Sequence, residues 1–341
     1  MAAVIGWDIG GAHVKAARAD EGRLTAVVQI ACAPHESIAS LEQALRDARA
    51  AVGDAERHRI TMTAELSDAF ESRARGVHTI AAIAAREIGV PDILFYAGEL
   101  GFLTHDEVGA NVHAVASANW RASAEFVTRH CADALFIDIG STTTDLAPLR
   151  AGGVGTLGAS DAERLAYGEL AYAGFSRGAP QAYATRAPVA GRWTPLVNEA
   201  FATMADVRRV LGDLPEGETD ADLSPTADGR PKTVAASCAR LVRLAGRDAA
   251  ELTDAQQRAL AQYFARAQLR VIEDQIALLE SRDAIAFDAP IVGAGVGRKL
   301  AARLAQAQGR TFIDFADLIA APRALADKAA NCAPASALAL L

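Results

Sequence analysis

The stretch LFIDIGSTTTDLAPL, residues 135–149, predicts two β-strands joined by a turn that carries an aspartate, a glycine and four hydroxyl side chains. A related stretch, GWDIGGAHVK, occupies residues 6–15, and the two align at Asp8-Ile9-Gly10 and Asp138-Ile139-Gly140. In each copy a second extended run follows, and then another turn signal, ADEGR or RAGG. This repeat predicts two related lobes, each with a β-sheet that carries one hairpin.

Helical and extended patterns alternate between the two copies. Apolar residues at helical spacing predict helices over residues 37–52, 76–90 and 111–131, and DILFYAG, residues 92–98, predicts a strand. This alternation indicates an α/β protein with mixed sheets covered by helices.

The length of 341 residues fits two domains. We expect a first lobe over residues 1–132 and a second lobe over 133–319, with the C-terminal segment, about residues 320–341, packing back on the first lobe. Acidic residues, Pro and Gly predict an exposed loop over residues 212–231. A helical block follows over about residues 233–282, which we interpret as an all-helical insertion that determines substrate specificity.

Composition and charge narrow the classes of partner. The net charge is −8, the pI is near 5.4, and scattered basic residues disfavour nucleic-acid binding, so we expect small-molecule partners. The start, MAAVIGWDIGG, lacks a basic region, and no stretch reaches the roughly 20 apolar residues that cross a bilayer, so we expect neither a secretory signal nor membrane binding. Four dispersed cysteines predict buried thiols in a reducing cytoplasm. These patterns leave the oligomeric state open.

A third stretch, DAPIVGAGVGRKLAARLAQAQGR, residues 288–310, predicts a short strand, a glycine-rich turn and a helix. Gly293, Gly295 and Gly297 would let the backbone approach a ligand at the helix N-terminus, where unpaired amides favour anions. The spacing is G-x-G-x-G rather than G-x-G-x-x-G, and no complete βαβ unit begins the fold. A dinucleotide-binding fold is therefore disfavoured.

In their order along the chain, the three stretches resemble the actin, sugar-kinase and heat-shock-chaperone superfamily. The resemblance implies a two-lobed actin-like ATPase fold, of the ribonuclease H-like type, with a helical insertion in the second lobe. It also implies two phosphate loops that face each other across a cleft, with Asp8 and Asp138 holding Mg²⁺ directly or through water. ATP or another nucleotide is compatible with such a cleft but is not required. The residues implied to bind phosphate or a nucleoside are Gly10, Gly11, Gly140, Ser141, Thr142, Thr143, Gly293, Gly295 and Gly297.

Further segments carry a closer resemblance that spans nearly the whole chain. They are TAELSDAFESRARGV (63–77), ANWRASAEF (118–126), YGELAYAGFSRGAP (167–180), NEAFATMADVRRVLGDL (198–214) and NCAPASALALL (331–341). These segments resemble the hydantoinase/oxoprolinase-related branch and, within it, the tetrahydromethanopterin-linked one-carbon transfer pathway proteins. The first loop departs from the family pattern, because His13-Val14 stands where Asn and a small or aliphatic residue are expected.

The closer resemblance implies a transferase of methylofuran biosynthesis. Archaeal members are associated with methanofuran synthesis, in which an aminomethylfuran-methyl diphosphate is joined to the phenol of glutamyl-tyramine. Mg²⁺, Lys15 and the hydroxyls of the second turn would stabilise the diphosphate as it leaves. Asp138 would be both a metal ligand and a catalytic residue. The base that takes the proton of the phenol stays open among Asp145, Glu169 and His13, in that order.

The same residues allow other interpretations. Asp8 and Asp138 would also cap turns, and Lys15 would also be a solvated hairpin lysine. The region of Trp120 would serve helix packing as readily as substrate contact, and Glu169 either lines the site or begins a helix. The phosphate loops alone equally predict an ATP-dependent small-molecule kinase, a hydantoinase-like amide hydrolase, or a non-catalytic nucleotide-binding partner in a one-carbon pathway.

Overall fold

The first Asp-Ile-Gly hairpin lies inside a six-stranded mixed sheet. The structure is a computed structural model that describes residues 3–341. The strands of this sheet are β1 (Val4–Ile9), β2 (His13–Asp20), β3 (Arg23–Ala31), β4 (Arg57–Met62), β5 (Asp92–Tyr96) and β6 (Phe102–Leu103). Their order is β3-β2-β1-β4-β5-β6, in which β1 and β2 form the antiparallel hairpin and β4 runs parallel to β1. Glu21 and Gly22, with φ of 53° and 76°, make the tight turn from β2 to β3.

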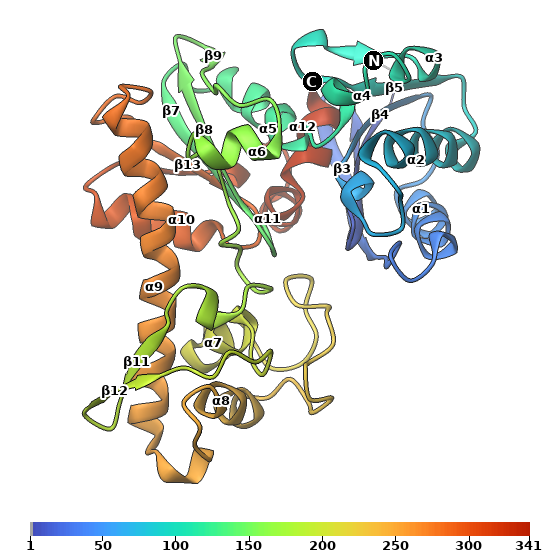
Figure 1. The fold of residues 1–341 in the computed structure, drawn as a ribbon. Helices are drawn as coiled ribbons and strands as arrows, with labels where there is room; N and C mark the ends of the chain where they lie inside the picture. The colour runs from blue at the N-terminus through green and yellow to red at the C-terminus, as the bar shows by residue number, and fades with distance from the viewer. Residues whose placement is uncertain (1–2) are drawn as a thin grey trace.

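Helices α1 (Ile38–Val52) and α2 (Arg73–Ile88) cover one face of this sheet, at the right of Figure 1. Ser37 begins α1 by accepting a hydrogen bond from the Ala39 amide, and Gly89 ends α2 in the left-handed conformation. The apolar side chains of both helices form one core with β1 and β4. The predictions of two helices and of the strand at β5 are therefore confirmed.

The second hairpin occupies the equivalent place in another sheet. The strands of that sheet are β7 (Ala134–Ile139), β8 (Thr144–Arg150), β9 (Gly153–Val154), β10 (Leu170–Ala171), β13 (Ile291–Ala294) and β14 (Phe312–Asp314). Their order is β10-β8-β7-β13-β14, with β9 added to β8. β7 and β8 form the hairpin, and β13 runs parallel to β7 as β4 does to β1. Ala151 and Gly152, with φ of 51° and 76°, repeat the turn that follows β2.

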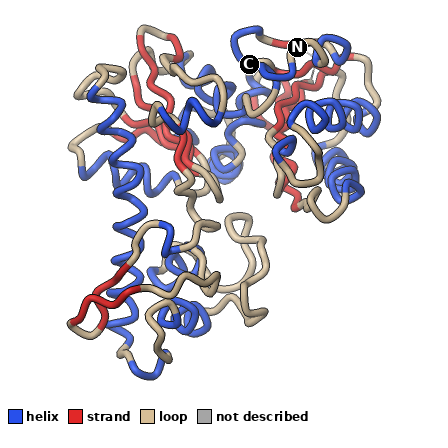
Figure 2. Tube along the Cα trace, in the orientation of Figure 1, coloured by secondary structure: helices blue, strands red, loops and turns tan. Residues whose placement is uncertain are grey.

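Helices fill the space between the two sheets, which Figure 2 shows as separate groups of strands. These helices are α5 (Asn119–Thr128), α11 (Arg323–Asn331) and α12 (Ala333–Leu340). One apolar cluster includes side chains from all three helices and from both sheets. α12 packs directly on β1 at Gly6, where a β-carbon would lie 2.0 Å from the carbonyl oxygen of Ala335. The C-terminal segment thus packs on the first sheet and joins it to the second (Figure 1).

A third unit projects from the second sheet along one long helix, α9 (Asp254–Ser281) (Figure 1). Its other elements are β11 (Arg186–Val189), β12 (Arg192–Pro195), α7 (Met204–Leu211) and α8 (Val234–Arg243). Phe264, in the first half of α9, packs in the core of this unit with Val189, whereas Ile276 packs in the core of the second sheet. The unit therefore begins before residue 233 and includes a β-hairpin, which differs from the predicted all-helical insertion. The apolar side chains of β11 are buried against α9, so the hairpin belongs to this unit.

The predicted helix over residues 111–131 is interrupted. It forms α4 (Val112–Val115) and α5, separated by Ser117, whose φ is 53°. The Ser117 hydroxyl donates to Glu65 Oε1 at 2.7 Å, and a bridge pairs Ala116 with Met62 at the end of β4. These contacts with the first sheet outweigh the local helical pattern. The remaining α-helices are α3 (His105–Val108), α6 (Asp161–Ala166) and α10 (Arg298–Ala307). Among residues 3–341, no helix is long and apolar enough to cross a membrane.

Candidate functional site

The two hairpins share the same register. Asp8 lies opposite Lys15 across β1 and β2, and Asp138 lies opposite Asp145 across β7 and β8. Each turn closes with the same hydrogen bond, from Gly10 N to His13 O in the first and from Gly140 N to Thr143 O in the second, both 2.9 Å. The sequence repeat is thus a repeat of backbone hydrogen bonds.

Both hairpins line one cavity of 510 Å³ between the lobes. The predicted site residues that the structure brings together there are Asp8, Gly10, Gly11, His13, Lys15, Asp138, Gly140, Ser141, Thr142, Thr143 and Asp145. The cavity is open to solvent, and its lining includes acidic, basic and hydroxyl side chains that suit a charged small molecule.

The first hairpin places a cation beside a buried carboxylate. Lys15 Nζ lies 3.4 Å from Asp8 Oδ2, and Asp8 Oδ1 is buried with no hydrogen-bond partner among the described residues. Burial opposes the charge on Lys15, but Asp8 and then Asp138 outweigh it and raise the pKa of the lysine. Burial, Lys15 and Arg177 together lower the pKa of His13 to about 4, so its imidazole is neutral at pH 7.

The second hairpin gathers negative charge. Burial, and then repulsion from Asp145, raises the pKa of Asp138 to about 7, although Lys15 opposes the shift. Asp145 accepts a hydrogen bond from Arg164 Nη1 at 2.8 Å. Burial nevertheless raises the pKa of Asp145, because the attraction of Arg164 is the smaller effect. Asp138 is therefore a carboxylic acid that gains or loses its proton near neutral pH.

Main-chain bonds hold the second turn in place. Residues after β10 donate to it, with Gly174 N bound to Thr142 O at 2.9 Å and Arg177 N bound to Ser141 O at 2.9 Å. Gly174 has room for no side chain, because a β-carbon would lie 2.3 Å from the carbonyl carbon of Thr142. The Thr144 hydroxyl turns away from the cavity and donates to Ala173 O at 3.0 Å. The turn thus presents Ser141, Thr142 and Thr143 to the cavity from a fixed backbone.

The late glycines support the second hairpin and do not line the cavity between the lobes. Gly295 has a φ of 81°, and a β-carbon there would lie 2.3 Å from Asp138 Oδ1. Gly297 N donates to Ile139 O at 2.9 Å, and Gly293 packs against the ring of Phe312. Gly295 and Gly297 allow the chain to pack closely against Asp138 and Ile139. A separate cavity of 410 Å³ lies beside the next residues of this motif, lined by Val296, Arg298 and Lys299 among others.

Glu169, the second candidate for the base, lies outside the cavity. Its carboxylate is fully buried, accepts hydrogen bonds from the amides of Leu157 (2.7 Å) and Gly158 (2.9 Å), and pairs with Arg282. The structure therefore places the buried carboxylate of Glu169 in an ion pair with the part-buried Arg282, immediately before β10 and outside the cavity. The local sequence, YGEL, does not distinguish this place from one in the cavity.

Arg164 and Arg177 line the cavity, although the sequence patterns did not single them out. Arg164 is buried, lies 3.9 Å over the ring of Trp120, and donates to both Asp145 and the main-chain oxygen of Glu169. Trp120 thus serves packing and also borders the cavity. Arg164 is a single arginine in the short helix α6, so no sequence periodicity marks it. Its contact with Asp145 shows that it belongs to the site.

The cavity between the lobes has two carboxylates that could bind a magnesium ion. Among residues 3–341, no group of three or more His, Cys, Asp or Glu side chains is arranged to hold a metal. The orphan oxygen of Asp8 and the carboxylate of Asp138 border the same cavity. This pair fits Mg²⁺, which commonly binds one or two carboxylates and completes its shell with water and substrate phosphate.

The chain resembles known proteins in sequence and in fold. The family model hydantoinase/oxoprolinase matches residues 57–325. A protein of Methanocaldococcus jannaschii named (4-{4-[2-(gamma-L-glutamylamino)ethyl]phenoxymethyl}furan-2-yl)methanamine synthase is 32% identical over 186 residues. The match covers 54% of this chain and 55% of that relative, so the chain spans about half of the relative's length.

Two solved structures share the arrangement of the lobes. A ROK family glucokinase from Streptomyces griseus, in complex with glucose and AMPPNP, superimposes with a TM-score of 0.51 and 14% identity, covering 99% of this chain and 98% of that one. A nucleotide-free acetone carboxylase gives a TM-score of 0.59 and 12% identity, covering 97% of this chain and 70% of that one. These likenesses confirm the two-lobed actin-like ATPase fold that the resemblance to the actin, sugar-kinase and heat-shock-chaperone superfamily implies.

Proposed function

Because the chain belongs to the hydantoinase/oxoprolinase family and its two hairpins border one cleft, we propose that it is a transferase of methylofuran biosynthesis. The name of the archaeal relative describes a phenoxymethyl link between a furan and a phenol that carries a glutamylaminoethyl group. The corresponding reaction joins an aminomethylfuran-methyl diphosphate to glutamyl-tyramine. The observation that carries the proposal is the pairing of a lysine hairpin with a hydroxyl-rich hairpin around one cavity.

In this reaction the phenol oxygen attacks the furan-methyl carbon, and the bond from that carbon to the diphosphate oxygen breaks. The electron pair of the broken bond leaves with diphosphate, and the proton of the phenol goes to a base. Negative charge therefore grows on the diphosphate as it leaves. Groups that stabilise this charge lower the barrier of the reaction.

The second turn and Lys15 suit the leaving diphosphate. The turn offers the hydroxyls of Ser141, Thr142 and Thr143 from a fixed backbone, and Lys15 keeps its positive charge beside Asp8. Asp8 and Asp138 would hold Mg²⁺, which when bound neutralises phosphate charge. Lys15 then serves both the carboxylates and the substrate, because its ammonium has three donors.

Asp145 suits the proton of the phenol. It borders the cavity, burial raises its pKa, and Arg164 fixes one carboxylate oxygen at 2.8 Å. A phenol in water has a pKa of about 10, so an acceptor with a raised pKa matches it better than an ordinary carboxylate does. The pKa of His13 is lowered to about 4, which makes it a weaker base than an ordinary histidine.

A direct test supplies the synthetic furan diphosphate and glutamyl-tyramine without ATP. Formation of the ether, followed by mass, with release of one diphosphate per ether, is the expected result. Product that requires ATP, or no ether at enzyme concentrations that saturate both substrates, would overturn the proposal.

The cavity beside the late glycines favours a second candidate function, an ATP-dependent enzyme. It measures 410 Å³ and carries the exposed Lys299 in the first turn of α10. ATP hydrolysis stimulated by a small molecule would select this candidate. Tight nucleotide binding without turnover would instead indicate a non-catalytic partner.

A further inference from the structure

A smaller cavity of 210 Å³ shares Arg177 with the cleft between the lobes. Its lining comes from the segment after β10, from the start of α7 and from the loop that precedes α8. Arg177 borders this cavity and the cleft alike. Hydroxyl and charged side chains dominate the rest of the lining, namely Ser176, Thr203, Asp206, Arg209, Asp222, Ser224 and Thr226.

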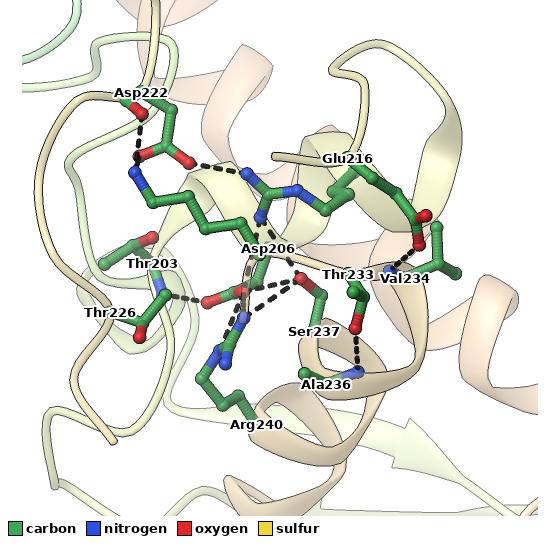
Figure 3. A network of polar contacts seen from close by, with 12 residues as sticks. Thr203, Asp206, Glu216, Asp222, Thr226, Thr233, Val234, Ala236, Ser237 and Arg240 are labelled. Carbon is green, nitrogen blue, oxygen red and sulfur yellow. Dashed lines mark hydrogen bonds and ion pairs between the residues drawn. The ribbon is translucent and has the colours of Figure 1, made fainter. Parts of the chain in front are cut away.

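A network of buried ion pairs forms the floor of this cavity (Figure 3). Asp206 accepts hydrogen bonds from Arg240 at 2.7 Å and from Ser237 at 2.7 Å, and Figure 3 shows these three side chains turned toward one another. Arg209 pairs with Asp222, whose other oxygen lies 3.6 Å from Lys232. Such a cross-linked floor is rigid, because every partner is fixed by another.

The charges within this floor cancel. The acids are Asp206, Glu218, Asp222 and Asp228, and the bases paired with them are Arg209, Arg230, Lys232 and Arg240. Four negative and four positive charges leave a net charge of zero.

Arg177 adds a positive charge that this network does not balance. The arginines that pair with Asp206 and Asp222 are Arg209 and Arg240, and Arg177 is exposed where the two cavities meet. Its main chain is tied to the second turn through Ser141 O, 2.9 Å from Arg177 N. The junction therefore carries an exposed guanidinium on a main chain that is held by the second turn. This charge favours an anion, and a planar carboxylate matches its donors.

We infer that the smaller cavity binds the free amino-acid end of the phenolic acceptor and that Arg177 pairs with its α-carboxylate. The inference rests on the proposed function, in which the phenol lies at the hairpins. A γ-linked glutamate leaves its α-carboxylate and α-amino group at the far end of the acceptor. The volume of 210 Å³ equals several water molecules of about 30 Å³ each, which leaves room for such a group.

This assignment refines the expected place of acceptor specificity. The lining comes from residues 176–177, 201–209 and 222–227, whereas the helical block over 233–282 supplies Ser237 and Arg240, which bind Asp206 in the floor. Residues of the helical block thus act on acceptor choice by holding Asp206 in position.

The test compares γ-glutamyl-tyramine with 4-aminobutanoyl-tyramine, which lacks only the α-carboxylate. Wild-type protein should prefer the glutamyl acceptor, and Arg177→Gln should reduce kcat/KM for that acceptor by about 10- to 100-fold relative to the analogue. Arg177→Lys, which keeps the charge, should lose less. Arg266→Gln removes an exposed arginine of α9 that does not line the cavity, and should leave the preference unchanged.

A second variant, Ser224→Phe, tests the cavity without removing a charge. It should lower kcat/KM for the glutamyl acceptor more than for tyramine, because the ring fills the space. Equal losses for all acceptors in Arg177→Gln would assign that residue to diphosphate and overturn the inference while leaving the proposed function intact. Absence of ether with every acceptor in the wild type would overturn the proposed function, and the subsite with it.

Discussion

The two hairpins have one backbone and opposite electrostatics. Each carries an aspartate at the end of its first strand and closes its turn with a 2.9 Å glycine amide bond. The residue across from that aspartate is Lys15 in the first hairpin and Asp145 in the second. Asp8 thus has a cation at 3.4 Å, whereas Asp138 meets a second acid and its pKa rises to about 7. The residue at one cross-strand position therefore gives the two hairpins different local charges, a cation beside Asp8 and a second acid beside Asp138.

The largest expected effect comes from the second hairpin. Asp138→Asn keeps the size of the side chain but removes a charge from the proposed metal site. Loss of one well-placed electrostatic contribution costs on the order of 3 kcal/mol, so turnover should fall at least about a hundredfold. Raising Mg²⁺ should restore part of the activity by mass action.

The measurement is a magnesium titration of turnover beside the melting temperature. Asp106→Asn, at a fully exposed position, is the matched control and should behave as the wild type. Normal turnover in Asp138→Asn would mean that the hairpin is a structural turn.

The first hairpin should respond differently to the loss of its charge. Lys15→Met should raise KM for the furan diphosphate by about 10- to 100-fold, since a charge-assisted hydrogen bond contributes roughly 1.5–3 kcal/mol. Added Mg²⁺ should not rescue it, because the missing charge belongs to the protein. If magnesium rescued both variants alike, the division of roles between the hairpins would be wrong.

The repeat allowed much of this arrangement to be predicted. Asp-Ile-Gly marks the same register in both sheets, so the hairpins and the α/β class follow from local pattern and turn chemistry. The break at Ser117 and the buried pair of Glu169 with Arg282 depend on contacts far away in the chain. Local periodicity contains no information on such contacts, and the same holds for Arg164 beneath Asp145.

Two acids near the second hairpin sharpen the comparison. Asp145→Asn should lower turnover by about tenfold or more, because general bases contribute at least that much. Glu169→Gln should instead cost roughly 1–3 kcal/mol of stability, since Arg282 loses its buried partner, and should leave turnover per folded molecule within about threefold. Activity normalised to the folded fraction from chemical unfolding separates the two. A larger kinetic loss in Glu169→Gln would return that residue to the candidate bases.

The smallest effect concerns stability and pH in the absence of Mg²⁺. The pKa of Asp138 rises from 3.8 to about 7 on folding, so its contribution is fully present below pH 3.8 and is lost as the pH rises toward 7. His13 acts in the opposite sense between pH 4 and 6.5, but it is present in both proteins and cancels in their difference. Asp138→Asn should therefore melt a few degrees above the wild type at pH 8, at about 2–4 °C per kcal/mol. The difference in melting temperature between the two proteins should decrease as the pH falls to 5. Mg²⁺ should decrease it at pH 8, because the ion binds and stabilises the wild type. A wild type that is the more stable protein at pH 8 in chelator would show that Lys15 already neutralises Asp138 and that both hairpins share one cation.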